Sequence, residues 1–441
     1  MTSYPEPAPV NLVAALNESG WTPRQKAYAL LVCLAVIIDG FDNQIIGLTI
    51  PAMMRDWGVS RGDFAPVLAL GIIGLSLGTM IAGWLGDRLG RRTVLVGCLL
   101  TFGTMTGLTI FTNSMHGFFL ARFLAGLGIG GAIPNAAALL AEFTPSRRQL
   151  LAVTIGIGCV PVGGIVAGNV AAQVLPAFGW KAMYIVGGVV PVLLAAVFLL
   201  ALPESPHFLV RDPAKWRRLV RIVNRMVGRD ALREDATFVY EVQRRAPLRA
   251  IFGAEYRRDT LALCAVFFLN LLCVYVFYNW LPVMLVSLGY GARGLGLGSA
   301  LFNLSGILAA FVGVYLIKIH GPRSVMIVWC ALAVLSGVLF AAFGGRELVF
   351  VLVAAEGAFI NGGQILFYAI AARIYDTSVR ATGIGAAGTV GRLGAIVSSY
   401  AGSALLQIDA AGRALFLFVA AAMLLTLLAV MFISPREVIR E

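Results

Sequence analysis

The chain of 441 residues is 59% apolar and only 13% charged, whereas a typical soluble domain carries about 25% charged residues. Apolar runs of about 20 residues, the length of a helix that crosses a bilayer, recur along the whole chain. These numbers exclude an ordinary soluble protein and indicate an all-α membrane protein. The net charge of +12 raises the alternative of nucleic-acid binding, which the placement of the basic residues argues against.

We predict twelve transmembrane helices in two six-helix bundles. A polar N-terminal tail (1–26), which lacks the apolar segment of a signal peptide, precedes the first bundle (27–202). A long central loop (203–259) leads to the second bundle (260–433), which ends in a short tail (434–441). The spans are expected at roughly 27–49, 64–85, 93–111, 117–141, 150–172, 182–202, 260–287, 295–317, 324–343, 347–371, 382–406 and 413–433.

The basic residues are distributed unevenly between the two sides of this topology. With the N-terminus inside, the inner loops and tails contain 26 of the 34 lysines and arginines, and the outer loops contain six. Basic residues accumulate in cytoplasmic loops, so both tails are expected in the cytoplasm and no nucleic-acid partner is implied. Within the central loop, residues 215–221 form a basic amphipathic stretch, which we expect to be a helix lying on the cytoplasmic membrane surface.

Two acidic residues, Asp39 and Asp42, interrupt the first predicted span. A carboxylate at bilayer depth costs about 2.5–3.5 kcal/mol on insertion scales and is rare unless it has a function. Residues three apart on a helix share a face. The pattern therefore predicts a proton or cation site that faces a wet cavity.

Between the second and third spans, residues 83–92 read GWLGDRLGRR. This fits the pattern GxxxDRxGRR and resembles the signature loop of the major facilitator superfamily, which implies a cytoplasmic gate here. An ordinary basic inner loop, the alternative, predicts the arginines but not Gly83, Asp87 and Gly90 in register. The expected gate residues are Gly83, Asp87, Arg88, Gly90, Arg91 and Arg92, together with Glu142 and Arg148 after the fourth span.

Arg122 lies about five residues inside the outer end of the fourth span, before spaced glycines and a proline. This arrangement resembles the fourth-helix motif of the same superfamily. At about 1.5 Å per residue its depth is close to that of Asp42, and we predict an ion pair of Arg122 with Asp42 or Asp39. Snorkelling to the outer interface is the alternative. Protonation of the acid would break the pair and bias an equilibrium between two conformations.

The two predicted bundles have similar sequences at corresponding points. Paired glycines at 130–131 and 362–363 each precede a similar span end, at 141–148 and 372–380. Two six-helix repeats with a site between them are typical of secondary transporters. The run PESP at 203–206 resembles the element that closes the first half in several solute-porter families, and we interpret it as a topology marker.

The sequence DGFD at residues 39–42 and Arg392 within GRLG narrow the resemblance. They are similar to motifs of the aromatic acid:proton symporters, importers of the benzoate, 4-hydroxybenzoate and protocatechuate type. The resemblance implies that Asp39 and Asp42 couple transport to protons, with Arg122 as their charge partner. It also implies a bacterial cytoplasmic (inner) membrane and a proton gradient as energy source, with no cofactor.

Arg392 lies about ten residues into the eleventh span, on a face of small and polar residues that favours a cavity lining. A fixed cation there would bind a substrate carboxylate, although a structural pair with Glu356 or another polar partner is the alternative. Glu356 itself is expected to point away from the substrate side, in a coupling or structural role. Aromatic and amide side chains on the seventh and tenth spans suit a hydroxylated ring, unless they serve to join helices. These candidates are Tyr275, Tyr278, Asn279, Asn361, Gln364 and Tyr368.

We therefore predict a secondary transporter, not an enzyme, that imports an aromatic carboxylate with protons by alternating access. Its expected partners are the aromatic acid, protons and the lipid bilayer, and we expect a monomer. The six cysteines and three histidines form no metal-binding pattern. A porter for another organic anion, such as a dicarboxylate or a sugar acid, and a non-transporting sensor of the same fold stay open as alternatives.

Overall fold

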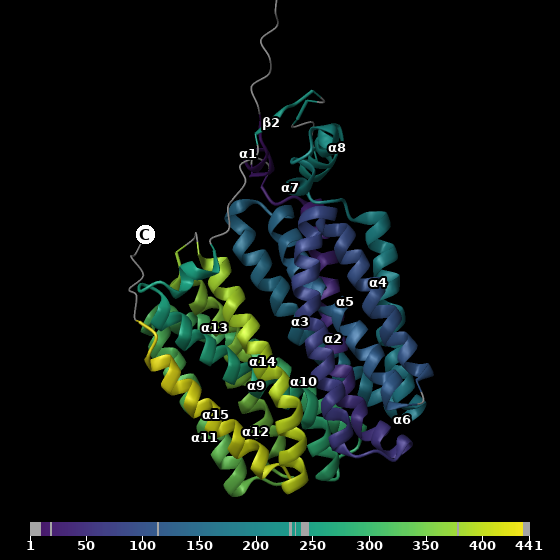
Figure 1. Cartoon of the computed structure of the whole chain (residues 1–441), viewed down its shortest axis with the longest axis vertical. Coiled ribbons are helices and arrows are strands. Elements are labelled where there is room, and N and C mark those ends of the chain that lie inside the picture. Colours follow the sequence, from purple (N-terminus) through teal and green to yellow (C-terminus); the bar gives the residue numbers. More distant parts are fainter. Residues whose placement is uncertain are drawn as a thin grey trace, which may run out of the picture.

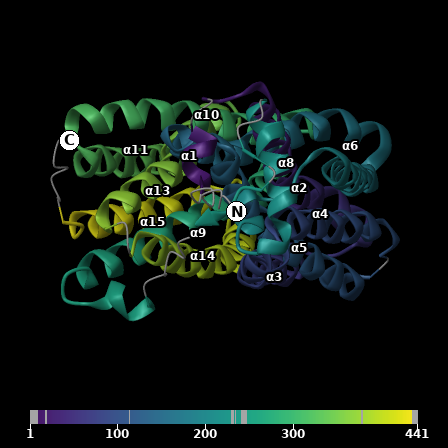
Figure 2. The same ribbon diagram turned by 90° about the horizontal axis from the view of Figure 1, so that it is seen from above.

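The computed structural model describes residues 10–17, 20–112, 114–228, 232–233, 235–239, 247–376 and 379–434. Nearly all of them are helical, and two bundles of long helices lie side by side (Figures 1 and 2). The first bundle consists of α2 (Pro23–Trp57), α3 (Arg61–Leu89), α4 (Arg91–Leu108), α5 (Met115–Phe143) and α6 (Gln149–Ala201). The second consists of α9 (Arg257–Ser287), α10 (Ala292–His320), α11 (Pro322–Phe343), α12 (Val349–Glu356), α13 (Gly362–Ile374), α14 (Arg380–Ile408) and α15 (Arg413–Met431).

Ten helices of the described chain are long and apolar enough to cross a membrane. One of them, α6, has 53 residues and is broken at Gly179, whose φ of 71° and ψ of −176° are not helical. Gly179 lies between the predicted fifth and sixth spans. The helix α14 covers the predicted eleventh span but is not among the ten, in keeping with its many small and polar residues. The structure is therefore that of an all-α, multi-pass membrane protein, and the count of twelve spans stays a prediction.

The short elements gather mainly at one end of the molecule, at the top of Figure 1, which we call the α8 end. The opposite end, where α3 begins, is called the Arg61 end. The short elements are β1 (Val10–Asn11), α1 (Leu12–Asn17), η2 (Ser146–Arg148), α7 (Pro206–Leu209), η3 (Pro213–Lys215), α8 (Trp216–Val227), β2 (Phe238–Val239) and η4 (Leu248–Phe252), with η1 (Thr109–Phe111) toward the other end and the π-helical η5 (Gly357–Asn361) between α12 and α13.

The basic helix α8 does not present its apolar side to a lipid surface. Its apolar residues, among them Leu219, Val223 and Met226, are buried in one cluster with Leu12 and Leu16 of α1. The strand β1 pairs in parallel with β2 beside them. The expectation of a helix lying on the membrane surface was wrong in this respect, because protein from the N-terminal segment covers the face that lipid would need.

Two apolar cores organise the bundles. One is confined to the first bundle and the α8 end, and includes Val32, Leu95 and Phe143. The other joins both bundles, since it includes Ile45 and Phe64 of the first as well as residues of the second. Its members from the first bundle lie in the part toward the Arg61 end, so the bundles share an apolar core there.

Candidate functional site

The two acidic residues of α2 are both buried inside the first bundle, where Asp39 is 0% exposed and Asp42 is 2% exposed. Helix α6 approaches α2 closely at Gly40, between the two acids. A Cβ added to this glycine would collide with the backbone of Val160. The carboxylates are thus held at a tight helix–helix contact, away from lipid, as expected for acids that serve a function.

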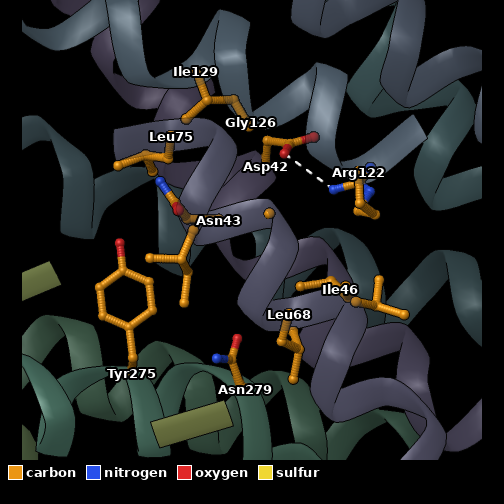
Figure 3. Close-up of a pocket in the computed structure, with 13 residues that line it drawn as sticks. Asp42, Asn43, Ile46, Leu68, Leu75, Arg122, Gly126, Ile129, Tyr275 and Asn279 are labelled. Atoms are coloured by element: carbon orange, nitrogen blue, oxygen red, sulfur yellow. Dashed lines mark hydrogen bonds and ion pairs between the residues drawn. The ribbon is translucent and has the colours of Figure 1, made fainter. Parts of the chain in front are cut away.

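Asp42 forms the predicted ion pair with Arg122, which is 6% exposed. The Arg122 Nη1 and Asp42 Oδ2 atoms are 3.3 Å apart, as Figure 3 shows. The Thr106 hydroxyl of α4 donates to Asp42 Oδ1 at 2.9 Å and accepts from Arg122 Nη2 at 3.3 Å, and the guanidinium lies over the Tyr184 ring at 4.9 Å. The predicted pair with Asp42 is confirmed, and snorkelling of Arg122 is excluded. Sequence reasoning missed Thr106, because a lone threonine in an apolar helix gives no distinctive signal.

Asp39 has different hydrogen-bond partners from Asp42, although the charges of the two carboxylates interact. Its Oδ2 accepts a hydrogen bond from Asn43 at 3.3 Å, and its buried Oδ1 has no partner in the described chain. Arg392, on α14 of the second bundle, lies near enough to interact with its charge. Arg392 also interacts electrostatically with Tyr275 and Tyr368. No hydrogen bond or ion pair between described residues holds the Arg392 guanidinium, and the alternative pair with Glu356 is not formed.

A cavity of about 50 Å³ lies beside Asp42 and Arg122, between the bundles (Figure 3). Its other lining residues are Asn43, Ile46, Val67, Leu68, Gly71, Ile72, Leu75, Gly126 and Ile129 of the first bundle and Tyr275 and Asn279 of the second. The space is enough for a few water molecules, whereas an apolar cavity that binds benzene measures about 150 Å³. The Nδ2 atom of Asn279 is buried and has no hydrogen-bond partner among the described residues, so it is an available donor at the wall. A ring would fit here only after the bundles move.

The other predicted substrate contacts divide into two groups. The Tyr278 hydroxyl donates to Asn361 Oδ1 at 3.3 Å, and Asn270 donates to Gln364 Oε1 at 2.6 Å. Tyr278, Asn361 and Gln364 therefore join α9 to the tenth predicted span. This is the alternative that the sequence left open for these residues, namely that they serve to join helices. Tyr368, 38% exposed, packs against the Phe267 ring instead and shares the surroundings of Arg392 with Tyr275.

A π-helical segment near these residues had no sequence signal. The segment η5 is π-helical and ends at Asn361, and such segments often mark functional sites. Glu356 precedes it, fully buried, and accepts a hydrogen bond from Ser336 at 2.8 Å. It faces α11, away from the cavity, as the helical spacing predicted.

The signature loop forms a polar cluster at the α8 end. Arg91 contacts Asp87, and its Nε is 4.0 Å from Glu142. Gly90 has a φ of 101°, which favours glycine. Arg88 lies over the exposed ring of Trp84 and Arg148 over Trp21, so both stand apart from the cluster. A Cβ on Gly83 would meet nothing within 4 Å, and packing in this conformation does not require that glycine.

Glu204 was underestimated as a mere topology marker. Its buried carboxylate accepts hydrogen bonds from the backbone N–H of Arg92 at 2.9 Å and of Thr93 at 3.3 Å. The N-cap of α4 is Gly90 and makes no side-chain cap, so Glu204 satisfies the first turn in its place. Ser205 bonds to Glu142, which ties the PESP element to the loop cluster. In the described chain, the contacts of this cluster stay within the first half.

The hydrogen bonds between described residues of the two halves lie toward the other end. Arg61 of α3 donates to the Leu406 carbonyl of α14 at 2.6 Å and to Ser287 of α9 at 3.0 Å. Ser299 of α10 donates to Gln44 of α2 at 2.9 Å. Together with the shared apolar core, these bonds join the halves on the Arg61 side of the buried acids.

The arrangement is a buried, charged centre between two helical bundles that are joined more firmly at one end. A family model described as the Major Facilitator Superfamily matches residues 32–312 and 263–440. The chain belongs to the major facilitator superfamily. It is 33% identical over 396 residues to the 4-hydroxybenzoate transporter PcaK of Pseudomonas putida, covering 89% of this chain and 88% of the relative.

Other relatives have related names. The chain is 32% identical to the gallate transporter of Pseudomonas putida, over 92% of this chain and 91% of the relative. It is 30% identical to the benzoate transport protein of Acinetobacter baylyi, over 88% and 85%. The family and these relatives place the chain among membrane transporters, and the predicted resemblance is confirmed.

Proposed function

We propose that this protein imports an aromatic carboxylic acid of the benzoate and hydroxybenzoate class together with protons, by alternating access. The observation that carries the proposal is the charge arrangement between the bundles. Arg122 is paired with Asp42, whereas no described residue forms an ion pair or hydrogen bond with Arg392, which interacts electrostatically with Asp39, Tyr275 and Tyr368. The names of the relatives, which are transporters of 4-hydroxybenzoate, gallate and benzoate, support the substrate class.

Asp39 and the substrate carboxylate would compete for Arg392. While Asp39 is ionised, its charge stabilises the guanidinium and opposes a second carboxylate. Protonation of Asp39 removes that competition and leaves Arg392 free to bind the substrate. Proton and substrate would then load together, which is the requirement for symport.

Asp42 and Arg122 have a separate part in this scheme. Their ion pair connects α2 to α5, and Thr106 of α4 joins both partners. Protonation of Asp42 would weaken the pair and favour a different packing of these helices. The electrochemical proton gradient would supply the energy, and no cofactor is needed.

Of the two arginines near the buried acids, Arg122 and Arg392, only Arg392 is without an ion pair among the described residues, which favours a monocarboxylate over the dicarboxylate alternative. A dicarboxylate needs a second cation, and Arg122 is already engaged by Asp42 inside the bundle. The apolar wall formed by residues such as Leu68, Leu75 and Ile129 suits a ring and not a sugar acid, which would need hydrogen-bonding groups.

The same proposal includes the topology. We propose twelve spans with both termini in the cytoplasm of a bacterial inner membrane, in a monomer. Two more spans than the ten apolar helices are needed. The break at Gly179 supports a division of α6 into two spans, and the length of α14, 29 residues, supports a further one.

The substrate class can be tested with labelled 4-hydroxybenzoate and purified protein in proteoliposomes. We expect uptake that unlabelled benzoate and gallate inhibit, and that succinate and glucuronate do not. Inhibition by succinate with no effect of benzoate would refute the aromatic substrate and favour a porter for another organic anion.

A further inference from the structure

A groove on the second bundle lies outside the transport site. It has a volume of about 760 Å³, within the range of about 300–1,000 Å³ typical of small-molecule sites. Its walls come from the start of α9 and the end of α15, at the α8 end of the molecule. The lining residues are Ala254, Arg257, Arg258, Leu261, Ala262, Ala265, Ala429 and Phe432.

The groove has one charged part and one apolar part. Arg257 and Arg258 begin α9 and are exposed. Farther along, three alanines leave a recess between α9 and α15. Leu261, 54% exposed, and Phe432, 61% exposed, form its apolar sides.

Arg257 and Arg258 are side by side at the start of α9 and both are exposed. No hydrogen bond or ion pair between described residues holds either guanidinium. Asp259, which follows them in the first turn of α9, accepts the Ser434 backbone N–H at 2.8 Å. Two neighbouring cations that form no bond with a described carboxylate are complementary to a phosphate group.

The position of the groove selects a lipid over a soluble anion. α9 and α15 are both candidate membrane spans, so the ends of these helices lie at the level where hydrocarbon meets headgroups. A free phosphate would use the arginines only, whereas an acyl chain would also cover the recess and the exposed Leu261 and Phe432.

We propose that this groove binds an anionic phospholipid, with the headgroup phosphate on Arg257 and Arg258 and an acyl chain along the alanine recess. Basic pockets between membrane helices on the cytoplasmic side bind such headgroups in other proteins. The site would hold the start of α9, the helix that carries Tyr275 and Asn279, against α15.

The test measures binding of dioleoyl-phosphatidylglycerol to the purified full-length protein by native mass spectrometry, with dioleoyl-phosphatidylcholine as the neutral lipid. Wild type should bind phosphatidylglycerol preferentially. The double variant R257Q/R258Q should weaken that binding about 30-fold, from the usual contribution of two basic residues near an anionic headgroup. The double variant R217Q/R218Q removes the same charge from α8, whose Arg217 and Arg218 are also exposed, and should bind as wild type does.

Two further arms separate lipid from soluble anion and guard against misfolding. Glycerol phosphate should fail to displace the lipid, and A265F, which keeps both arginines but fills the recess, should also weaken lipid binding. Melting temperatures in detergent micelles identify variants that are folded. Equal binding by R257Q/R258Q and wild type, equal loss in R217Q/R218Q, or displacement by glycerol phosphate would overturn the proposal.

Discussion

Asp42 and Arg122 show how a charged residue is tolerated inside a membrane bundle. Each would be costly alone, and here each supplies the other's opposite charge while the Thr106 hydroxyl bonds to both. Removing one partner of a buried pair leaves an uncompensated charge and costs about 3–5 kcal/mol in soluble proteins, whereas replacing both can be nearly neutral.

We therefore expect D42N to lower the melting temperature and the double variant D42N/R122Q to recover much of the loss. The measurement is thermal unfolding of the purified variants in one detergent at one pH. Additive losses in the double variant would show that the two residues do not stabilise one another.

Arg392 is the residue expected to recognise the substrate charge. A hydrogen-bonded charge pair contributes about 1.5–3 kcal/mol, so R392A should weaken benzoate binding by about 10- to 100-fold. Benzamide, a neutral ring of similar shape, should lose far less affinity, and R392K should keep part of the benzoate affinity. Calorimetric titration of both ligands provides the comparison, and an equal loss for benzoate and benzamide would remove Arg392 as the counter-ion.

At the scale of elements, the sequence predicted the buried charged residues better than it predicted the helix–helix contacts around them. The depths of Asp42 and Arg122 followed from helix rise alone, because both lie on long, regular helices. Tyr278, Asn361 and Gln364 were harder to assign, since an amide at helical spacing can face a ligand or a neighbouring helix with the same pattern. The π-helical turn at η5 and the docking of α8 under α1 depend on tertiary contacts that no local pattern reports.

The PESP element illustrates a role that becomes visible only in three dimensions. Glu204 accepts hydrogen bonds from two backbone N–H groups that lie 112 and 111 residues earlier in the sequence. Loss of a cap typically costs about 0.5–2 kcal/mol, so E204A should lower the melting temperature by a few degrees. E347A, at an exposed glutamate, is the control. If the two variants melt alike, Glu204 does not stabilise the start of α4.

At the scale of the whole molecule, hydrogen bonds between described residues join the halves on the Arg61 side, whereas the described ion pairs of the signature-loop cluster at the α8 end lie within the first half. In an alternating-access cycle, this conformation corresponds to a site closed toward the predicted outside. Arg61 holds α3 to the ends of α14 and α9, and its loss should favour opening at that end.

Spin labels at K181C and E347C, on a background without native cysteines, report this opening across the two halves. R61A should shift the distance distribution to longer values, whereas R55A, at an exposed arginine near the same end, should leave it unchanged. An unchanged distribution in R61A would mean that Arg61 does not control this end.

The most direct test of the account is uptake of labelled 4-hydroxybenzoate into proteoliposomes, with and without an imposed inward proton gradient, by wild type and D39N. Wild type should accumulate the acid above equilibrium only with the gradient. D39N, in which Arg392 no longer has a titratable competitor, should exchange substrate across the membrane but fail to accumulate it. Gradient-driven accumulation by D39N equal to that of wild type would contradict the proposal that Asp39 couples proton binding to substrate binding.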